Sequence, residues 1–87
     1  MKIKKGFVVR SIAGESVVVA LGPASKCFNG IIKLNDTGRF LWDKLEKGCT
    51  VEELAAALLS EYDVNESIAN KDVENFVKTL EGANILE

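Results

Sequence analysis

Carboxylates and thiols are the side chains of this chain best suited to chemistry: it has 13 carboxylates and two thiols. Acid–base or nucleophilic catalysis usually requires a histidine, or a cysteine or serine activated by a base that a third group holds in place. The chain has no histidine, and its C-terminal carboxylates stand where helix caps and solvated helix faces would place them. These carboxylates are Glu52, Glu53, Glu61, Asp63, Glu66, Asp72 and Glu74. Phosphate-binding glycine motifs are also missing, so we expect a binding protein and not an enzyme.

The two thiols give no sign of a metal site. Cys27 and Cys49 are separated by 21 residues, and no Cys-x-x-Cys pair occurs. Without histidine, the usual zinc frameworks are excluded. We therefore expect two free, partly buried cysteines and no metal or other cofactor bound by this chain.

The sequence contains no sign of export or of membrane insertion. The basic residues 1–5 are not followed by the apolar run of a signal peptide. No stretch approaches the roughly 18 consecutive apolar residues of a membrane span. The expected location is cytoplasmic, with no membrane partner.

Size and charge favour a small binding module. A chain of 87 residues can bury one hydrophobic core, so residues 1–87 are predicted to form a single domain. The net charge of −2 is unevenly spread. Residues 1–47 hold nine Lys/Arg and four Asp/Glu, a net +5, whereas residues 48–87 hold two and nine, a net −7. This pattern indicates either two solvated faces of opposite sign or a bipolar surface that orients a charged partner.

The N-terminal third predicts a three-stranded sheet. Residues 7–12 and 16–21 are rich in Val and Ile and flank Ala13-Gly14, where Gly14 can adopt the positive φ of a tight hairpin turn. A third strand is predicted at about residues 27–34. Because the first two strands pair with each other, the third is expected to be an open edge. Gly30 within it would leave room for a second backbone, and the N–H of Ile31, or otherwise that of Ile32, is expected to face that edge.

Three amphipathic helices are predicted to follow the sheet. Each begins at a residue that favours the N-cap position; these are Asn35, Thr50 with Glu53 as its capping-box partner, and either Asn65 or Ser67. The helices are expected to end near Gly48, Glu61 and Glu81, with Gly82 as the last C-cap. The predicted fold class is α+β with the order βββααα, an antiparallel three-stranded sheet followed by three helices, similar to a winged helix-turn-helix.

The hydrophobic periodicity of these helices predicts a common core. The residues on the expected inner faces are Leu41, Trp42, Leu45, Val51, Leu54, Ala55, Leu58, Ala69, Val73, Phe76, Val77 and Leu80. Trp42 is expected to be a structural anchor, and Ile85 and Leu86 are expected to fold back onto the core.

A winged-helix layout raises the alternative of a DNA-binding or regulatory protein. A DNA-reading helix needs basic and amide side chains toward bases and phosphates. Residues 51–81 offer only Lys71 and Lys78 against eight acidic residues. This charge argues against nucleic acid as a partner.

An ordered set of residues across the three predicted helices carries a family resemblance. The set consists of Leu34, Asn35, Gly38, Leu41, Trp42, Leu45, Thr50, Val51, Glu52, Glu53, Leu54, Leu58, Tyr62, Asp63, Val64, Asp72, Val73, Phe76 and Val77. At these spacings the chain resembles the PqqD family, small proteins that escort precursor peptides to their modifying enzymes. The resemblance extends from Gly6 to Leu86. Similar modules are called peptide recognition elements of ribosomally made, post-translationally modified peptides.

The resemblance implies a peptide chaperone, monomeric or homodimeric, that binds the leader segment of a precursor. It also implies a partner enzyme, often a radical S-adenosylmethionine maturase whose iron–sulfur clusters belong to that enzyme. In similar proteins the leader lies against the third strand, in the cleft beside the third helix. The matching residues here are Phe28, Asn29, Gly30, Ile31, Ile32 and Lys33 on the strand, and Asp72, Asn75, Phe76 and Thr79 on the helix. Plain core packing is the alternative for Ile32 and Phe76, whereas Leu34, Asn35, Gly38, Trp42 and Leu45 are expected to cap and pack and not to bind.

Overall fold

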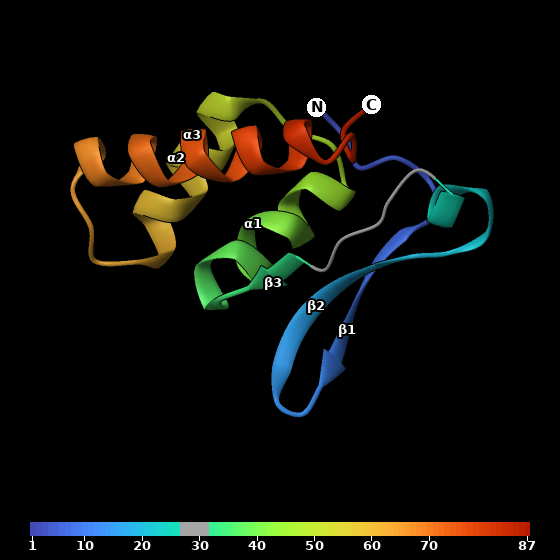
Figure 1. The fold of residues 1–87 in the computed structure, drawn as a ribbon. Coiled ribbons are helices and arrows are strands. Elements are labelled where there is room, and N and C mark those ends of the chain that lie inside the picture. Colours follow the sequence, from blue (N-terminus) through green and yellow to red (C-terminus); the bar gives the residue numbers. More distant parts are fainter. Residues whose placement is uncertain (27–31) are drawn as a thin grey trace.

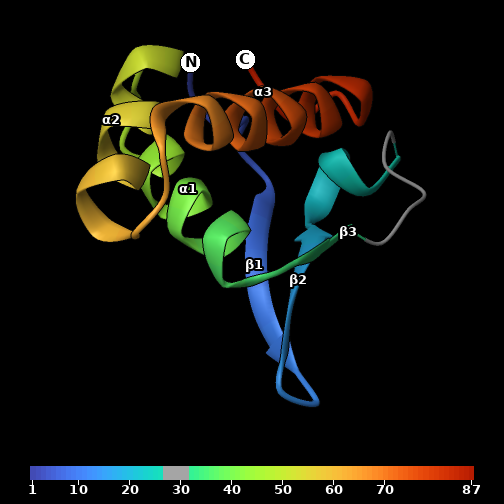
Figure 2. The same cartoon turned by 90° about the vertical axis from the view of Figure 1, so that its left-hand side faces the viewer.

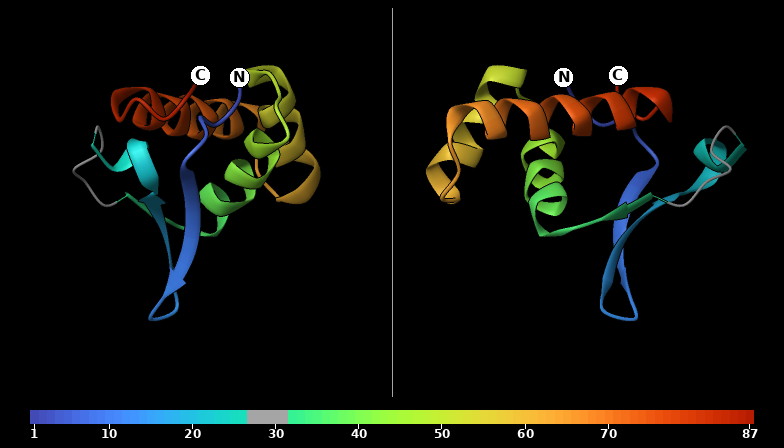
Figure 3. Two further views of the ribbon diagram at one scale, coloured as in Figure 1. Left: turned by 90° about the vertical axis from the view of Figure 1, so that its right-hand side faces the viewer. Right: turned by 60° about the vertical axis from the view of Figure 1, so that its left-hand side comes forward.

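The computed structural model describes residues 1–26 and 32–87, and their element order confirms the predicted βββααα fold (Figure 1). The elements are β1 (Phe7–Ile12), β2 (Glu15–Ala20), a short 3-10 helix η1 (Gly22–Lys26), β3 (Ile32–Leu34), α1 (Asp36–Glu46), α2 (Val51–Glu61) and α3 (Glu66–Gly82). The three helices gather at one end of the molecule, and the β1–β2 hairpin extends away from them (Figures 2 and 3). Of the predicted third strand, only Ile32–Leu34 belongs to the part that is described.

The sheet is antiparallel with the order β1-β2-β3, which makes β2 central and β3 an edge strand. Ile12 pairs with Glu15, so Ala13 and Gly14 form the predicted two-residue turn. Both turn residues have positive φ, 53° at Ala13 and 81° at Gly14. This is the primed geometry that matches the twist of a hairpin, and it places Ala13 in a conformation unfavourable for a residue with a Cβ.

Each helix begins at a polar side chain that accepts a backbone N–H three residues later. Asn35 caps α1, Thr50 and Glu53 form a reciprocal capping box at α2, and Asn65 caps α3. The alternative start at Ser67 is therefore wrong, because Asn65 accepts the N–H of Ile68 at 2.8 Å.

The ends of two helices test the predicted glycine caps. Gly48, with φ of 85°, follows α1 and donates its N–H to the Leu45 carbonyl at 2.9 Å, as expected. Gly82 is not the C-cap of α3, since the helix continues through it to Ala83. Asn84 has the left-handed φ of 60° instead, a conformation that asparagine tolerates because its short side chain can hydrogen-bond locally.

One hydrophobic core joins the helices to one face of the sheet. Its fully buried side chains are Trp42, Leu41, Leu45, Leu54, Leu58, Leu80, Ile85, Val18 and Val73. Val51 was expected to be buried and is 41% exposed. Helical spacing places it on the same face as Leu54, Ala55 and Leu58, but as the first residue of α2 it lies at the end of that face, and the buried residues begin at Leu54. No helix in residues 1–26 and 32–87 is long and apolar enough to cross a bilayer.

The two chain ends lie side by side and close the core (Figure 1). Ile3 and Leu86 form an antiparallel bridge, flanked by backbone hydrogen bonds from Lys4 N–H to the Ile85 carbonyl and from Glu87 N–H to the Lys2 carbonyl. Ile85 is fully buried and Leu86 packs against the core. The predicted return of residues 85 and 86 onto the core is therefore seen in the structure.

Candidate functional site

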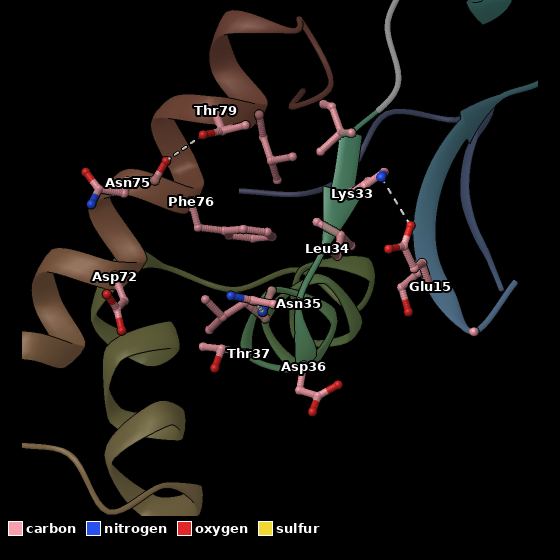
Figure 4. A pocket seen from close by; sticks show the side chains of 16 residues that line it. Glu15, Lys33, Leu34, Asn35, Asp36, Thr37, Asp72, Asn75, Phe76 and Thr79 are labelled. Carbon is pink, nitrogen blue, oxygen red and sulfur yellow. Dashed lines mark hydrogen bonds and ion pairs between the residues drawn. The ribbon is translucent and has the colours of Figure 1, made fainter. Parts of the chain in front are cut away.

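A cleft of about 780 Å³ lies between β3 and α3, and the first turn of α1 lies at its base (Figure 4). Its lining comes from four places in the chain: Gly14, Glu15 and Ser16 at the hairpin tip; Ile32, Lys33, Leu34 and Asn35 on and after β3; Asp36, Thr37, Gly38 and Leu41 of α1; and Asp72, Asn75, Phe76, Thr79 and Leu80 of α3. Segments that are distant in sequence therefore share one surface.

The described residues that the sequence assigned to a binding site all line this cleft. They are Ile32, Lys33, Asp72, Asn75, Phe76 and Thr79. The other four, Phe28, Asn29, Gly30 and Ile31, lie outside the described residues. The structure thus brings the described end of the strand wall, Ile32 and Lys33, beside the helical wall, and the role of these residues in binding stays a prediction.

The helical wall arises from the spacing of its side chains. Positions 72, 75, 76 and 79 fall on one face of α3, since residues three and four apart are neighbours on a helix, and this face borders the buried stripe. Phe76 is half-buried, packs against the core and projects toward β3 (Figure 4). Phe76 therefore packs against the core and also lines the cleft, and its role in binding stays a prediction. The Thr79 hydroxyl donates to the Asn75 carbonyl at 2.9 Å, which directs its proton back to the helix.

The strand wall presents backbone groups as well as side chains. In an antiparallel ladder, hydrogen-bonded pairs alternate with pairs whose N–H and C=O groups point to the other side. The pair Ile12–Glu15 closes the two-residue turn, and Leu21 N–H donates to the Gly6 carbonyl, so odd-numbered residues of β2 point their N–H and C=O groups toward β1.

Even-numbered residues of β2 consequently bond to β3, where Ser16 pairs with Leu34 and Val18 with Ile32. The N–H and C=O groups of Ile32 therefore face β2, so the alternative that the Ile32 N–H faces the open edge is wrong. The same alternation directs the backbone of Lys33 away from β2, toward the edge of the sheet. Ile31 lies outside the described residues.

The first turn of α1 joins the cleft in a way that the sequence did not predict. Leu34, Asn35 and Gly38 were expected only to cap and pack, yet all three also line the cleft. Gly38 is buried, and a Cβ on it would lie 3.2 Å from Asn35 Oδ1 and 3.5 Å from the Leu34 side chain. This close approach ties the end of β3 to the start of α1. The signal that could have revealed this contribution is the absence of a loop between β3 and α1. The strand ends at Leu34, Asn35 is the N-cap, and α1 begins at Asp36, so the first helical turn must lie beside the end of the strand.

The charge of the cleft is acidic at one end. Lys33 Nζ pairs with Glu15 at 3.2 Å, with both side chains largely exposed. Asp36 and Asp72 form no ion pair with any residue in the described ranges. Glu15, Asp36 and Asp72 against Lys33 leave the lining with a formal charge of −2.

The remaining candidates for chemistry lie elsewhere. Cys49 is a free, half-buried thiol outside the cleft lining. Burial, and secondarily the negative charge of Glu53, raises the pKa of this thiol above its usual value, so the unreactive protonated form predominates at neutral pH. Cys27 lies outside the described residues. Residues 1–26 and 32–87 contain no group of three or more potential metal ligands.

The chain is similar to a known protein family and to two solved structures. The profile of the family described as coenzyme PQQ synthesis protein D (PqqD) matches residues 15–86. One similar solved structure is described as TbiB1 in complex with the TbiA(beta) leader peptide. Its sequence is 29% identical to this chain, the match covers 100% of this chain and 95% of the TbiB1 chain, and the TM-score is 0.77. A second solved structure is described as lasso peptide synthetase B1 complexed with the leader peptide. It is 22% identical, the match covers 99% of this chain and 95% of that chain, and its TM-score of 0.75 shows the same fold. No curated protein matched the sequence significantly.

Proposed function

The chain belongs to the PqqD family, and we propose that it is a non-catalytic chaperone that binds the leader segment of a ribosomally made precursor peptide and presents it to a modifying enzyme. The observation that carries this proposal is the cleft between an open strand edge and the exposed flank of α3. The leader-bound state of TbiB1 supports it, since that protein is 29% identical to this chain over 100% of this chain and 95% of its own.

The leader binds as a fourth strand along β3. An unpaired strand edge satisfies the backbone groups of an extended peptide, and neighbouring pockets select its side chains. Within the described part of β3, Lys33 supplies the outward N–H and C=O, and α3 encloses the added strand from the opposite wall through Asp72, Asn75, Phe76 and Thr79. Strand pairing provides affinity for many sequences, so the side chains of α3 provide selectivity.

The partner enzyme supplies the chemistry. A maturase, such as a radical S-adenosylmethionine enzyme with its own clusters, acts on the core of the precursor while this chain holds the leader. The whole of residues 1–87 forms the binding unit, because the cleft draws on the hairpin, β3, α1 and α3 around one core. The complex forms in the cytoplasm, where precursor peptides are synthesised.

A winged-helix role in DNA binding is not favoured. On α3, Lys78 is engaged with Glu74 at 3.1 Å, which leaves Lys71 as the other basic residue of a helix that also carries Glu66, Asp72 and Glu81. A helix with this balance repels a phosphate backbone. Fluorescence anisotropy with random duplex at low salt should therefore show no salt-sensitive micromolar binding.

A proline at Lys33 tests strand pairing. Lys33→Pro removes the outward N–H, and proline is tolerated on an edge strand whose N–H faces solvent. Loss of one backbone hydrogen bond should weaken binding of a synthetic peptide with the leader sequence encoded beside this gene by about two- to tenfold. Lys33→Ala is the matched control, since it removes the side chain and the Glu15 pair but keeps the N–H. Equal affinity of the two variants would contradict pairing at Lys33.

Amide chemical shifts locate the bound peptide. Titration of isotope-labelled protein with the same leader peptide should shift the amides of residues 32–38 and 72–79 together, because these segments line the cleft. Shifts confined to residues 42–47, the part of α1 and its C-terminus that does not line the cleft, would place the peptide elsewhere and would overturn the groove assignment.

A further inference from the structure

The register of β3 determines which side chains of a bound segment enter the cleft; this step rests on the proposed function. In an added strand, the residue opposite Lys33 exchanges backbone hydrogen bonds with it and points its side chain to the same face as Lys33. Ile32 and Leu34 point to the opposite face, where both pack against the core. The two peptide residues that flank the central one therefore point their side chains into the cleft, two positions apart.

The two peptide side chains that enter the cleft face different groups of the protein. At the Ile32 end of β3, Thr79 of α3 lies across the cleft (Figure 4), and its hydroxyl proton is already bonded to its own helix. Leu80, the next residue of α3, also lines the cleft. At the opposite end, Asp72 lies level with the first turn of α1, while Asp36 stands at the outer rim (Figure 4). Phe76 projects between the two ends at the level of Leu34.

The acidic end is not neutralised within the described residues. Glu15 is engaged with Lys33, whereas Asp72 and Asp36 have no basic partner there. The N-terminus of α1 carries a partial positive charge, which Asn35 and Asp36 already complement, Asn35 by accepting the Gly38 N–H at 2.8 Å. Asp72 is free of such a role, because it lies beyond the first turn of α3.

We propose that the cleft selects leader segments with a cationic side chain and an apolar side chain two residues apart. The Lys or Arg side chain lies against Asp72 with its aliphatic stem along Phe76, and the apolar side chain lies between Ile32, Thr79 and Leu80. Pairing antiparallel to β3 continues the sheet as it stands and is the more stable arrangement per residue. The residue opposite Leu34 then precedes the one opposite Ile32, so the motif in the chain direction of the leader is cationic, any residue, apolar.

A peptide library tests the motif without knowledge of the natural leader. Random peptides of about 12 residues, longer than a typical strand, are displayed and panned against the wild-type protein, Asp72→Asn and Glu81→Gln. Glu81 is an exposed acid of the same helix outside the cleft lining, so its substitution is a matched change of charge. Wild type and Glu81→Gln should enrich the cationic-x-apolar pattern. Asp72→Asn should retain the apolar preference and lose the cationic one.

A double-mutant cycle measures the contact itself. A selected synthetic peptide and its Lys→Gln or Arg→Gln form are titrated against the wild type and Asp72→Asn. Each single change should weaken binding by about two- to fivefold, as expected for a solvent-exposed ion pair, and the double change should weaken it no further. The effect should vanish at about 0.5 M salt, where the screening length is only a few ångströms.

The outcomes separate this inference from the proposed function. Enriched peptides that shift the amides of residues 32–38 and 72–79 but show no cationic preference, or that show the reverse order, would overturn the motif and leave peptide binding in the cleft intact. Additive effects in the cycle would overturn the Asp72 contact. Peptides that bind without shifting those amides would overturn both proposals.

Discussion

At the residue scale, Phe76 shows why this cleft is both rigid and accessible. Its ring packs against the core yet lies among the cleft-lining residues, so the aromatic surface offered to a peptide is held by the same contacts that stabilise the fold. Asp72 and Asn75 flank it as exposed side chains. An apolar surface held in place loses little conformational freedom on binding, whereas the polar side chains around it tune selectivity.

Trp42 anchors the core and gives the first prediction. It is 0% exposed, and Trp42→Ala should lower the free energy of unfolding by about 3–5 kcal/mol, since it leaves a large cavity. Its indole Nε1 is buried without a hydrogen-bond partner among the described residues. Trp42→Phe therefore removes no hydrogen bond to these residues and, because it keeps an aromatic ring in the core, should cost less than about 2 kcal/mol. Urea denaturation measures both. An unchanged midpoint for Trp42→Ala would mean that this side chain is exposed in solution.

Cys49 gives a prediction about pH. Its thiol pKa is raised in the folded state by burial, so folding favours the protonated thiol. The corresponding stability is fully present below the unfolded-state pKa of roughly 8.5 and is lost as the pH rises through the folded-state pKa. The stability difference between wild type and Cys49→Ala should therefore be constant near neutral pH and shift against the wild type at alkaline pH. Denaturant midpoints of both proteins across this range measure it, and a shift in favour of the wild type would contradict the assignment.

At the scale of elements, local signals were read correctly where a feature depends on near neighbours in sequence. The caps at Asn35, Thr50 and Asn65 each use a contact three residues away, and the hairpin turn needs only two residues. The predicted C-cap of α3 at Gly82 is wrong. Gly82 and Asn84 both suit a helix terminus, and the contact that fixes the end of the helix, between Ile85 and the segment before β1, is distant in sequence. The predicted burial of Val51 is also wrong, since helical periodicity identifies the inner face of a helix but not how far along the helix that face stays in contact with the core.

In the candidate site too, features that depend on near neighbours in sequence were predicted, and features that depend on distant contacts were not. Residues 72, 75, 76 and 79 follow from helical spacing beside a buried stripe, and β3 follows from being the strand left without a second neighbour. The contribution of Leu34, Asn35 and the first turn of α1 depends on how the chain turns after β3. Gly38 permits that turn because it lacks a Cβ, which would lie only 3.2 Å from Asn35 Oδ1, and this close approach cannot be inferred from residue types alone.

The hairpin turn carries strain that a substitution should relieve. Ala13 has a φ of 53°, a left-handed conformation that costs a residue with a Cβ roughly 1–2 kcal/mol, whereas asparagine visits it routinely. Ala13→Asn creates the Asn-Gly pair favoured in such turns and should raise the free energy of unfolding by about 0.5–1 kcal/mol. Thermal denaturation measures the gain. As a control, Ala56→Asn on the exposed face of α2 should lower stability slightly through helix propensity; equal effects would exclude relief of turn strain.

At the scale of the whole molecule, the basic and acidic halves meet at the cleft. Lys33 and Glu15 come from the net basic N-terminal half, and Asp72 comes from the net acidic C-terminal half. Asp36 of the N-terminal half also lines the cleft, so that half contributes a net −1 to the lining and the cleft as a whole is acidic. The uneven charge along the chain is not repeated within the cleft, and an orienting role for it stays a prediction.

The cleft exists only while the sheet and α3 remain joined, and the pairing of the chain ends helps to join them. Ile85 is 0% exposed, and its carbonyl accepts the Lys4 N–H at 2.8 Å while its own N–H donates to the Leu80 carbonyl at 3.0 Å. The residue thus links the segment that leads into β1 with the end of α3. A defect there should loosen both walls of the cleft together.

Ile85→Ala tests this coupling. The substitution should cost about 2–4 kcal/mol, a large share of the roughly 5–15 kcal/mol available to a small domain, whereas Leu86→Ala, at a half-buried position, should cost less. Hydrogen exchange should show lower protection in β2 and α3 of the Ile85→Ala variant by the same factor, because one cooperative core holds both. Leader affinity, extrapolated to the fraction that is folded, should be unchanged, since Ile85 does not line the cleft. If α3 lost protection while β2 kept it, the helices and the sheet would be separate cooperative units, and the cleft would be a contact between two units and not a feature of one core.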